Sequence, residues 1–180
     1  MVNTVTNSGG QTRVDIPSDN FYTPGWLVDQ INYFFDGCID LDPCADPLKR
    51  IPASNHCCFP DNGLKQKWKG NIFCNPPYSK TSYSDIGMWV AKAMEAFDRG
   101  NEVLLLLPAN MDTKWAHKIL QVNQSEQHCR LLFFRGRIKF LDSSYFETKG
   151  SGRFSSMLVY LGKNRGWRFN NIFGIFGEVL

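Results

Sequence analysis

The chain has 180 residues, of which 43% are hydrophobic and 21% are charged. This length fits one domain with a sizeable core, and the modest charged fraction excludes a disordered acidic or basic tail. The longest apolar run without proline, Val103–Leu107, is far shorter than the roughly 20 residues that a membrane-spanning helix needs. The N-terminus, MVNTVTNSGG, lacks the basic start and apolar stretch of a secretory signal. We therefore expect a cytoplasmic protein with no membrane partner.

The six cysteines indicate reduced core thiols rather than a disulfide framework. Cys57 and Cys58 are adjacent, no C-x-x-C pair occurs, and the spacings match no familiar zinc-ligand pattern.

Positive charge is concentrated late in the chain. Between Arg130 and Arg168 there are nine Lys and Arg residues against two Asp and Glu. A solvated face is the ordinary explanation of such a run, and a polyanionic partner such as DNA is the alternative.

The N-terminal part predicts an arm followed by a helix. Residues 1–19 are polar, contain Gly9-Gly10 and Pro17, and are expected to form a flexible arm ahead of a single domain over residues 20–180. Thr23 suits the N-cap of a helix with Pro24 at its first position, and apolar residues then recur at helical spacing as far as Phe35.

Three short strands are predicted next. Cys38–Pro43 is an apolar stretch that ends in acidic residues, and His56–Phe59 is a second candidate strand, while Ala45–Asn55 predicts no clear element. Asn71–Cys74 is the third, and it ends where prolines begin.

The rest of the chain alternates strands with helices. The predicted helices are Ile86–Phe97 and Thr113–Leu120, and the predicted strands are Val103–Leu107, Arg130–Phe134, Ile138–Phe140 and Met157–Leu161. This alternation predicts an α/β fold with a mostly parallel central sheet, and the closing run of strands predicts an antiparallel edge.

The tetrapeptide Asn75-Pro76-Pro77-Tyr78 is the most informative motif because it directly follows an apolar strand. An amine on a base or amide is a poor nucleophile, since its lone pair is delocalised. The Asn75 side-chain oxygen and the Pro76 carbonyl can each accept one amine hydrogen, which points the lone pair at an electrophile. The prolines fix the backbone, and Tyr78 offers a ring for stacking.

At this motif the chain resembles the S-adenosylmethionine-dependent amino-methyltransferases, which act on bases in DNA or RNA or on a protein glutamine. Further segments resemble the phage-type DNA N6-adenine methyltransferase (Dam) family over roughly residues 20–175: Phe21–Pro24, Ile39–Ala45, Asp61–Leu64 with Trp68, Phe134–Phe140 and Ser155–Gly162. The resemblance implies a Rossmann-like methyltransferase fold with helices on both faces, methylation of adenine N6 in DNA, and a host-cytoplasm location if the protein is viral. An RNA or a protein glutamine is the alternative substrate.

The resemblance also implies residue roles. Asn75 and Pro76 hold the target amine of a flipped base, Pro77 fixes the turn, Tyr78 stacks on the base, and Phe140 is a candidate for its other face. The cofactor residues would be Tyr22, Thr23, Pro24, Asp40, Asp42, Pro43 and Asp61. The first three would lie by the methionine part of the cofactor, with Thr23 near its carboxylate. The ribose ligand stays open between Asp42, Asp46 and Asp61. The sulfonium is already an activated electrophile, so no metal is expected.

Two further expectations concern the spacing and the DNA. Only about 30 residues separate Asp42 from Asn75, so one strand–helix crossover must be shortened or missing. The chain leaves little room for a separate target-recognition domain, so loops such as Leu141–Phe154 must supply specificity. Candidate DNA contacts are Lys80, Arg135, Arg137, Lys139, Phe140, Lys149 and Arg153.

Overall fold

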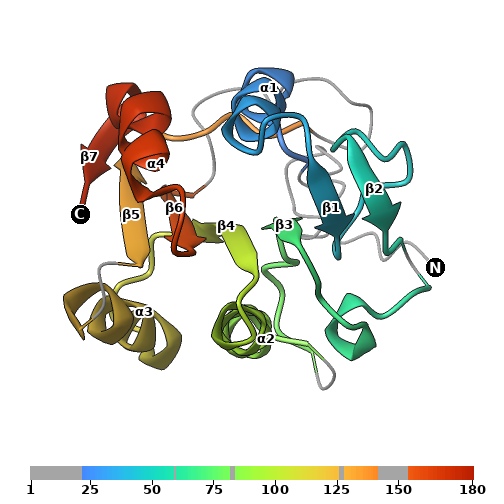
Figure 1. The fold of residues 1–180 in the computed structure, drawn as a ribbon. Helices are drawn as coiled ribbons and strands as arrows, with labels where there is room; N and C mark the ends of the chain where they lie inside the picture. Colours follow the sequence, from blue (N-terminus) through green and yellow to red (C-terminus); the bar gives the residue numbers. More distant parts are fainter. Residues whose placement is uncertain (1–21, 59, 82–83, 126–127, 142–153) are drawn as a thin grey trace, which may run out of the picture.

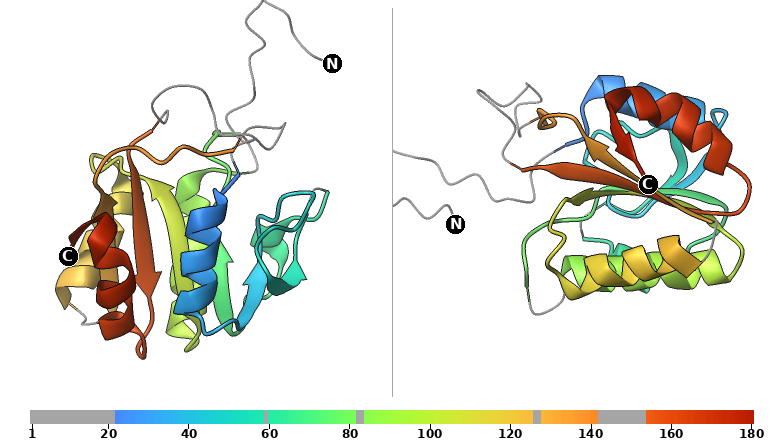
Figure 2. Two further views of the ribbon diagram at one scale, coloured as in Figure 1. Left: turned by 90° about the horizontal axis from the view of Figure 1, so that it is seen from above. Right: turned by 90° about the vertical axis from the view of Figure 1, so that its left-hand side faces the viewer.

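The computed structural model describes residues 22–58, 60–81, 84–125, 128–141 and 154–180. A seven-stranded sheet forms the middle layer (Figure 1). Helices α1 (Gly25–Phe34) and α4 (Gly166–Phe173) cover one face, and α2 (Ile86–Asp98) and α3 (Lys114–Ser125) cover the other (Figures 1 and 2). The predicted arm over residues 1–19 lies outside the described residues.

The sheet has a parallel half and an antiparallel half. Its strand order is β2-β1-β3-β4-β6-β5-β7. The first four are parallel neighbours, whereas β6, β5 and β7 join as antiparallel strands. The bounds are β1 Ile39–Asp42, β2 Ala53–His56, β3 Asn71–Cys74, β4 Glu102–Pro108, β5 Cys129–Phe134, β6 Ser156–Leu161 and β7 Gly177–Val179. The predicted α/β class, with an antiparallel edge and a Rossmann-like arrangement, is confirmed.

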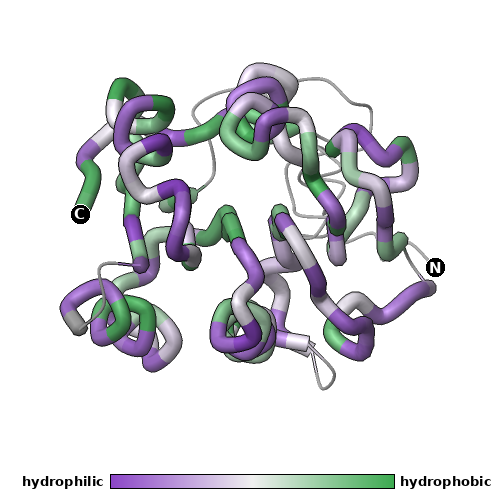
Figure 3. Tube along the Cα trace, viewed as in Figure 1, coloured by the Kyte–Doolittle hydropathy of each residue, from purple (hydrophilic) through white to green (hydrophobic). Residues whose placement is uncertain are grey.

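Strand β4 explains why its sequence is an unbroken hydrophobic run. Val103, Leu105 and Leu107 belong to the core with α2 and α3, while Leu104 and Leu106 belong to the core with α1 and α4. A strand covered on both faces needs apolar residues at every position. The covering helices carry both hydrophilic and hydrophobic residues (Figure 3), as helices with one buried side do.

The expected shortening lies between β1 and β3. No helix connects β1 to β2, and among the described residues of the β2–β3 connection the 3₁₀ turn η1 (Gly63–Lys65) is the one helical element. Gly63 approaches the chain after β1 so closely that a Cβ there would lie 2.0 Å from the Pro43 carbonyl oxygen. The buried Trp68 indole donates a 2.9 Å hydrogen bond to the Gly63 carbonyl. These contacts hold the Asp61–Leu64 segment against the end of β1.

Several predicted boundaries were wrong. Pro24, not Thr23, occupies the N-cap position of α1, because Gly25 is the first residue with helical geometry. The second strand is Ala53–His56, since it pairs in register with β1 from Ile39 to Asp42. Ile138–Phe140 forms no strand, and the neighbouring Leu141 instead makes an isolated antiparallel bridge to Tyr22. That bridge brings the start of the described chain beside the segment after β5.

Helix α4 and strand β7 were missed by the sequence reasoning. The turn before α4 is organised by Glu102, the first residue of β4, whose carboxylate accepts hydrogen bonds from the Tyr160 hydroxyl at 2.5 Å and the Asn164 amide at 2.9 Å. Arg165 Nη1 lies 3.2 Å from the same carboxylate. Because these partners are distant in sequence, no local pattern marks the helix start. None of the helices in the described ranges is long and apolar enough to cross a membrane.

Candidate active site

A cavity of about 750 Å³ opens at the carboxyl ends of β1 and β3. In the sheet, β2 lies on one side of β1, and β3 and β4 lie on its other side. The strand order therefore reverses direction at β1, and open α/β sheets bind ligands at such a switch point. Its size is that of a small-molecule or cofactor site. The lining residues are Tyr22, Thr23, Val28, Asp42–Pro47, Arg50, Ile51, Cys57, Cys58, Pro60–Leu64, Phe73, Asn75–Tyr78, Thr81, Ser84, Trp89 and Phe140.

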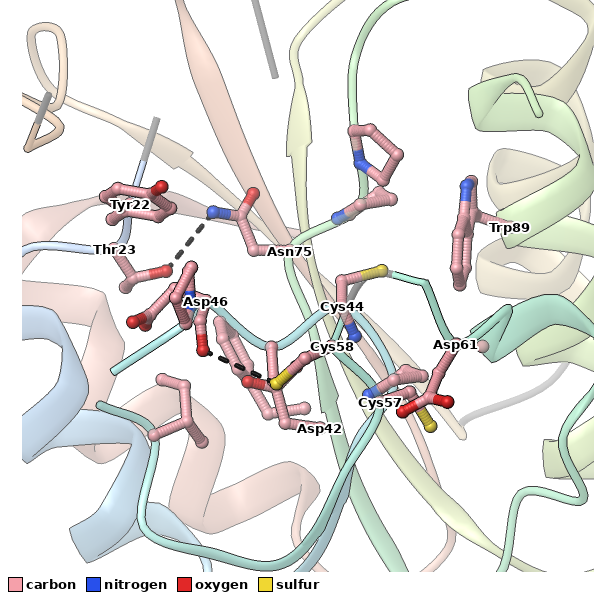
Figure 4. A pocket seen from close by; sticks show the side chains of 18 of the residues that line it. Tyr22, Thr23, Asp42, Cys44, Asp46, Cys57, Cys58, Asp61, Asn75 and Trp89 are labelled. Atoms are coloured by element: carbon pink, nitrogen blue, oxygen red, sulfur yellow. Dashed lines mark hydrogen bonds between the residues drawn. The ribbon is translucent and has the colours of Figure 1, made fainter. Parts of the chain in front are cut away.

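Asn75 is oriented by a residue from the start of the domain. It follows β3 directly, where two prolines end the strand, and its Nδ2 donates a 3.2 Å hydrogen bond to Oγ1 of the buried Thr23 (Figure 4). An amide whose nitrogen points to Thr23 turns its carbonyl Oδ1 away from that residue. The side chain therefore presents an acceptor beside the cavity.

Tyr78 is held through its hydroxyl. That hydroxyl donates a 3.3 Å hydrogen bond to the Leu106 carbonyl, and the ring meets Phe154 edge-on with centroids 5.9 Å apart. Burial raises the pKa of Tyr78 above its ordinary value, so the group stays protonated near neutral pH. The tyrosine can offer a ring face to a ligand, but it is not a proton acceptor.

Asp42 is a buried carboxyl group in the floor of the cavity, 3% exposed. Burial, with a smaller contribution from the charge of Asp46, raises the pKa of Asp42 to about 7. The Cys44 backbone N–H opposes this shift through a 3.0 Å hydrogen bond to Oδ1. A carboxyl group with this pKa keeps its proton at pH values well above those at which an exposed aspartate loses it.

The three cavity aspartates are spread along the site (Figure 4). Asp46 lies with Tyr22, Thr23 and Asn75, whereas Asp61 lies at the Trp89 end. All three acidic candidates for the ribose therefore line the same cavity. Their charges differ, because burial favours the neutral form of Asp42 and Asp46 is paired with Arg50.

Two predicted cofactor residues do not line the cavity. Asp40 Oδ2 instead accepts a 2.7 Å hydrogen bond from the Asn71 backbone N–H. Gly70, with φ of +83°, leaves space for this carboxylate, since a Cβ there would lie 2.1 Å from Oδ2. Asp40 thereby joins β1 to the start of β3, and Pro24 serves at the start of α1.

The predicted DNA residues divide into three groups. Phe140 is buried and lines the cavity. Four residues are exposed and lie outside the cavity lining: Lys80, Arg135, Arg137 and Lys139. Arg135 makes an exposed ion pair with Glu178 at 3.4 Å. Lys149 and Arg153, with most of the loop expected to supply specificity, lie outside the described residues.

Several cavity residues were missed by the sequence reasoning. Trp89 was assigned to the core side of its helix, and it indeed packs against Trp68, but it also lines the cavity and its Nε1 donates a 2.8 Å hydrogen bond to Ser84 Oγ. Arg50 lies in a stretch for which no element was predicted. Its Nε pairs with Asp46 at 3.3 Å, and its guanidinium lies 4.7 Å from the Tyr22 ring centroid.

The cysteines in and beside the cavity form no disulfide. All six cysteines are free, and the Cys44 and Cys74 sulfurs lie 3.7 Å apart. Burial raises the pKa of Cys44, Cys57 and Cys74, which disfavours the reactive thiolate. Within the described part of the chain there is no group of three or more His, Cys, Asp or Glu side chains that could hold a metal. The arrangement suits positioning by hydrogen bonds rather than covalent catalysis.

Comparison with known proteins adds to this geometry. A DNA N-6-adenine-methyltransferase from Escherichia phage T1 is 29% identical over 108 residues, which is 59% of this chain and 42% of that relative. The chain thus matches less than half of the relative's length. The family described as DNA N-6-adenine-methyltransferase (Dam) matches residues 11–171, almost the whole chain. The chain therefore belongs to the DNA N-6-adenine-methyltransferase (Dam) family.

Proposed function

We propose that this chain is an S-adenosylmethionine-dependent methyltransferase that methylates the N6 amine of adenine in DNA. The observation that carries the proposal is the Asn75 amide, oriented by Thr23 at the switch-point cavity of a Dam-family chain. RNA and a protein glutamine carry the same kind of amine and are the alternative substrates.

The cavity residues fit the cofactor. About 750 Å³ is enough for a nucleoside joined to an amino acid, and the carboxyl groups of Asp42, Asp46 and Asp61 can accept hydrogen bonds from its polar groups. Asp61 at one end is suited to the adenine amine or a ribose hydroxyl, and Asp42 to a ribose hydroxyl. Tyr22, Thr23 and Pro43 line the same space. When bound, S-adenosylmethionine supplies a methyl group on a sulfonium, an electrophile that needs no metal.

The target amine is held by the chain itself. Asn75 Oδ1 and the Pro76 carbonyl each accept one amine hydrogen, and the amine's lone pair is thereby aimed at the methyl carbon. Tyr78, anchored through Leu106, stacks on the base, and Phe140 contacts it from another side. Pro77 keeps the backbone of this turn rigid.

DNA must deliver a flipped adenine to this cavity, and unstacking costs a few kcal/mol. We assign the offsetting phosphate contacts to Lys80, Arg135, Arg137, Lys139, Lys149 and Arg153. We further infer that residues 20–180 act as one catalytic domain and that loops supply what sequence preference exists.

The decisive experiment is transfer of tritiated methyl groups to DNA, RNA or protein, followed by digestion and chromatography. Label in N6-methyladenine from DNA is the expected result, and label found only in RNA or protein would reject the proposal in favour of the alternative. Asn75→Ala should reduce transfer at least about 100-fold while S-adenosylhomocysteine still binds. Asn170→Ala, at an exposed position on α4, is the matched control and should keep the parent rate.

A further inference from the structure

One basic side chain enters the cavity from a segment that the sequence did not mark. Among the described residues that line the cavity, Arg50 is the one Lys or Arg, and its side chain is 22% exposed. The other ionisable side chains of the lining that can carry charge near neutral pH are the carboxyl groups of Asp42, Asp46 and Asp61. The proposed cofactor's amino-acid part carries a carboxylate, and that anion needs a basic partner of its own.

The chain fixes the direction of Arg50 from two sides. Asp46 folds the turn that precedes it, because its Oδ1 accepts the Leu48 N–H at 2.8 Å and its Oδ2 lies 3.3 Å from both the backbone N and Nε of Arg50. The Tyr22 ring lies 4.7 Å from the guanidinium carbon, at a distance suited to a cation–π contact. A guanidinium held at its Nε and face is restricted in orientation before any ligand arrives.

The Arg50–Tyr22 contact lies at the end of the cavity that contains Asn75. Tyr22 is followed directly by Thr23, which binds the Asn75 amide at 3.2 Å, and Asp46 lies at that same end (Figure 4). In the cofactor, the transferred methyl group and the amino-acid chain are attached to the same sulfur. A sulfur placed for transfer beside Asn75 therefore has its carboxylate within a short chain's reach of Arg50.

We propose that Arg50 binds the carboxylate of the cofactor's amino-acid part through its guanidinium, with Asp46 and Tyr22 as positioning residues. This proposal rests on the proposed function, since it concerns the same cofactor. It assigns a role to the cavity's basic residue and predicts that the protein discriminates between adenosyl ligands with and without a carboxylate.

The test compares three ligands by calorimetric titration: S-adenosylhomocysteine, S-adenosyl-3-thiopropylamine, which lacks only the carboxylate, and 5′-methylthioadenosine, which lacks the whole amino-acid part. Arg50→Met keeps the length and packing of the side chain without its charge. It should weaken S-adenosylhomocysteine binding by roughly 10- to 100-fold, as loss of a charge-assisted hydrogen-bonded pair does. Binding of the two ligands without a carboxylate should change less than about threefold.

The controls separate this role from a structural one. Arg99→Met removes another arginine that pairs with an acidic residue four positions earlier, on the exposed end of α2, and should change no affinity. Arg50→Lys keeps the charge but not the planar guanidinium with its paired N–H donors. It should weaken S-adenosylhomocysteine binding by a factor between one and that of Arg50→Met, and leave the affinity for the other two ligands unchanged. It serves as the test if Arg50→Met does not fold. The role of Arg50 would be overturned if Arg50→Met weakened the binding of all three ligands by the same factor, or if it left all three affinities unchanged. A parent protein that binds none of the three would instead overturn the proposed cofactor, and this proposal with it.

Discussion

The Asn75 amide and the Thr23 hydroxyl are joined by a 3.2 Å hydrogen bond across 52 positions of sequence. Thr23 lies two residues before α1 and Asn75 immediately follows β3, so the bond links the start of the described chain to the proposed catalytic turn. Thr23 is buried, which keeps water from competing for the bond. It fixes which of the two amide atoms points toward Thr23 and which points away from it.

Thr23→Val is expected to lower kcat by about tenfold, because the isosteric side chain cannot accept the Asn75 N–H and the amide loses its orientation. Affinity for S-adenosylhomocysteine should fall by a smaller factor than kcat, because Thr23 lines the cofactor cavity but the lost hydrogen bond is the one that orients Asn75. Single-turnover methylation and calorimetry measure the two quantities. Thr23→Ser keeps the acceptor and should restore most of the rate; a serine variant as slow as the valine variant would show that shape, not the hydrogen bond, matters.

Asp42 should make the stability of the ligand-free protein depend on pH. Burial raises the pKa of Asp42 from 3.8 to about 7, so the folded state keeps a proton that the unfolded state has lost between those values. The free energy of unfolding therefore falls as pH rises from about 4 to about 7, by up to roughly 4 kcal/mol for this group.

Urea denaturation of the parent and of Asp42→Asn across this pH range isolates the contribution, since the other titrating groups are common to both proteins. The stability difference between the two should shift in favour of the asparagine variant as pH rises. Parallel curves would contradict the raised pKa.

Gly63→Ala should disrupt the Asp61 end of the cavity. The new Cβ would lie 2.0 Å from the Pro43 carbonyl oxygen, so the turn must move away from the end of β1. We expect at least tenfold weaker S-adenosylhomocysteine binding, together with a loss of stability of about 1–3 kcal/mol. Gly25→Ala is the control: it is the first residue of α1, nothing lies within 4 Å of its added Cβ, and it should bind like the parent.

Tyr160→Phe tests the polar cluster at the amino end of β4. It removes a hydroxyl that donates to Glu102 at 2.5 Å and accepts the Arg165 backbone N–H at 2.9 Å. Loss of these two hydrogen bonds should cost about 1–3 kcal/mol in the free energy of unfolding, although Glu102 keeps Asn164 and Arg165 as partners. Ligand affinity should be unchanged, because the cluster lies at the amino end of β4 whereas the cavity lies at the carboxyl ends of the parallel strands. A variant as stable as the parent would show that water or rearrangement replaces both bonds.

The sequence alone determined those helices and strands in which apolar residues form a continuous run or recur at a regular spacing. Asn71–Cys74 was predicted with the bounds observed, because an apolar run ends at prolines, and the α2 helix was predicted to within one residue from its apolar spacing. The tetrapeptide after β3 also marked one wall of the cavity, since strand ends in α/β sheets converge on ligand sites.

Only the tertiary structure decided what those residues face. Helix α4 starts at a turn held by Glu102 from β4, and β7 exists through its pairing with β5, so neither has a strong pattern of its own. Asp40 and Asp42 are two positions apart on one strand, yet one carboxylate joins strands and the other lines the cavity. Arg50 gave no signal because its position depends on contacts with Asp46 and Tyr22. Sequence periodicity reports burial along one element, whereas the direction of a polar side chain depends on partners brought together only when distant segments pack.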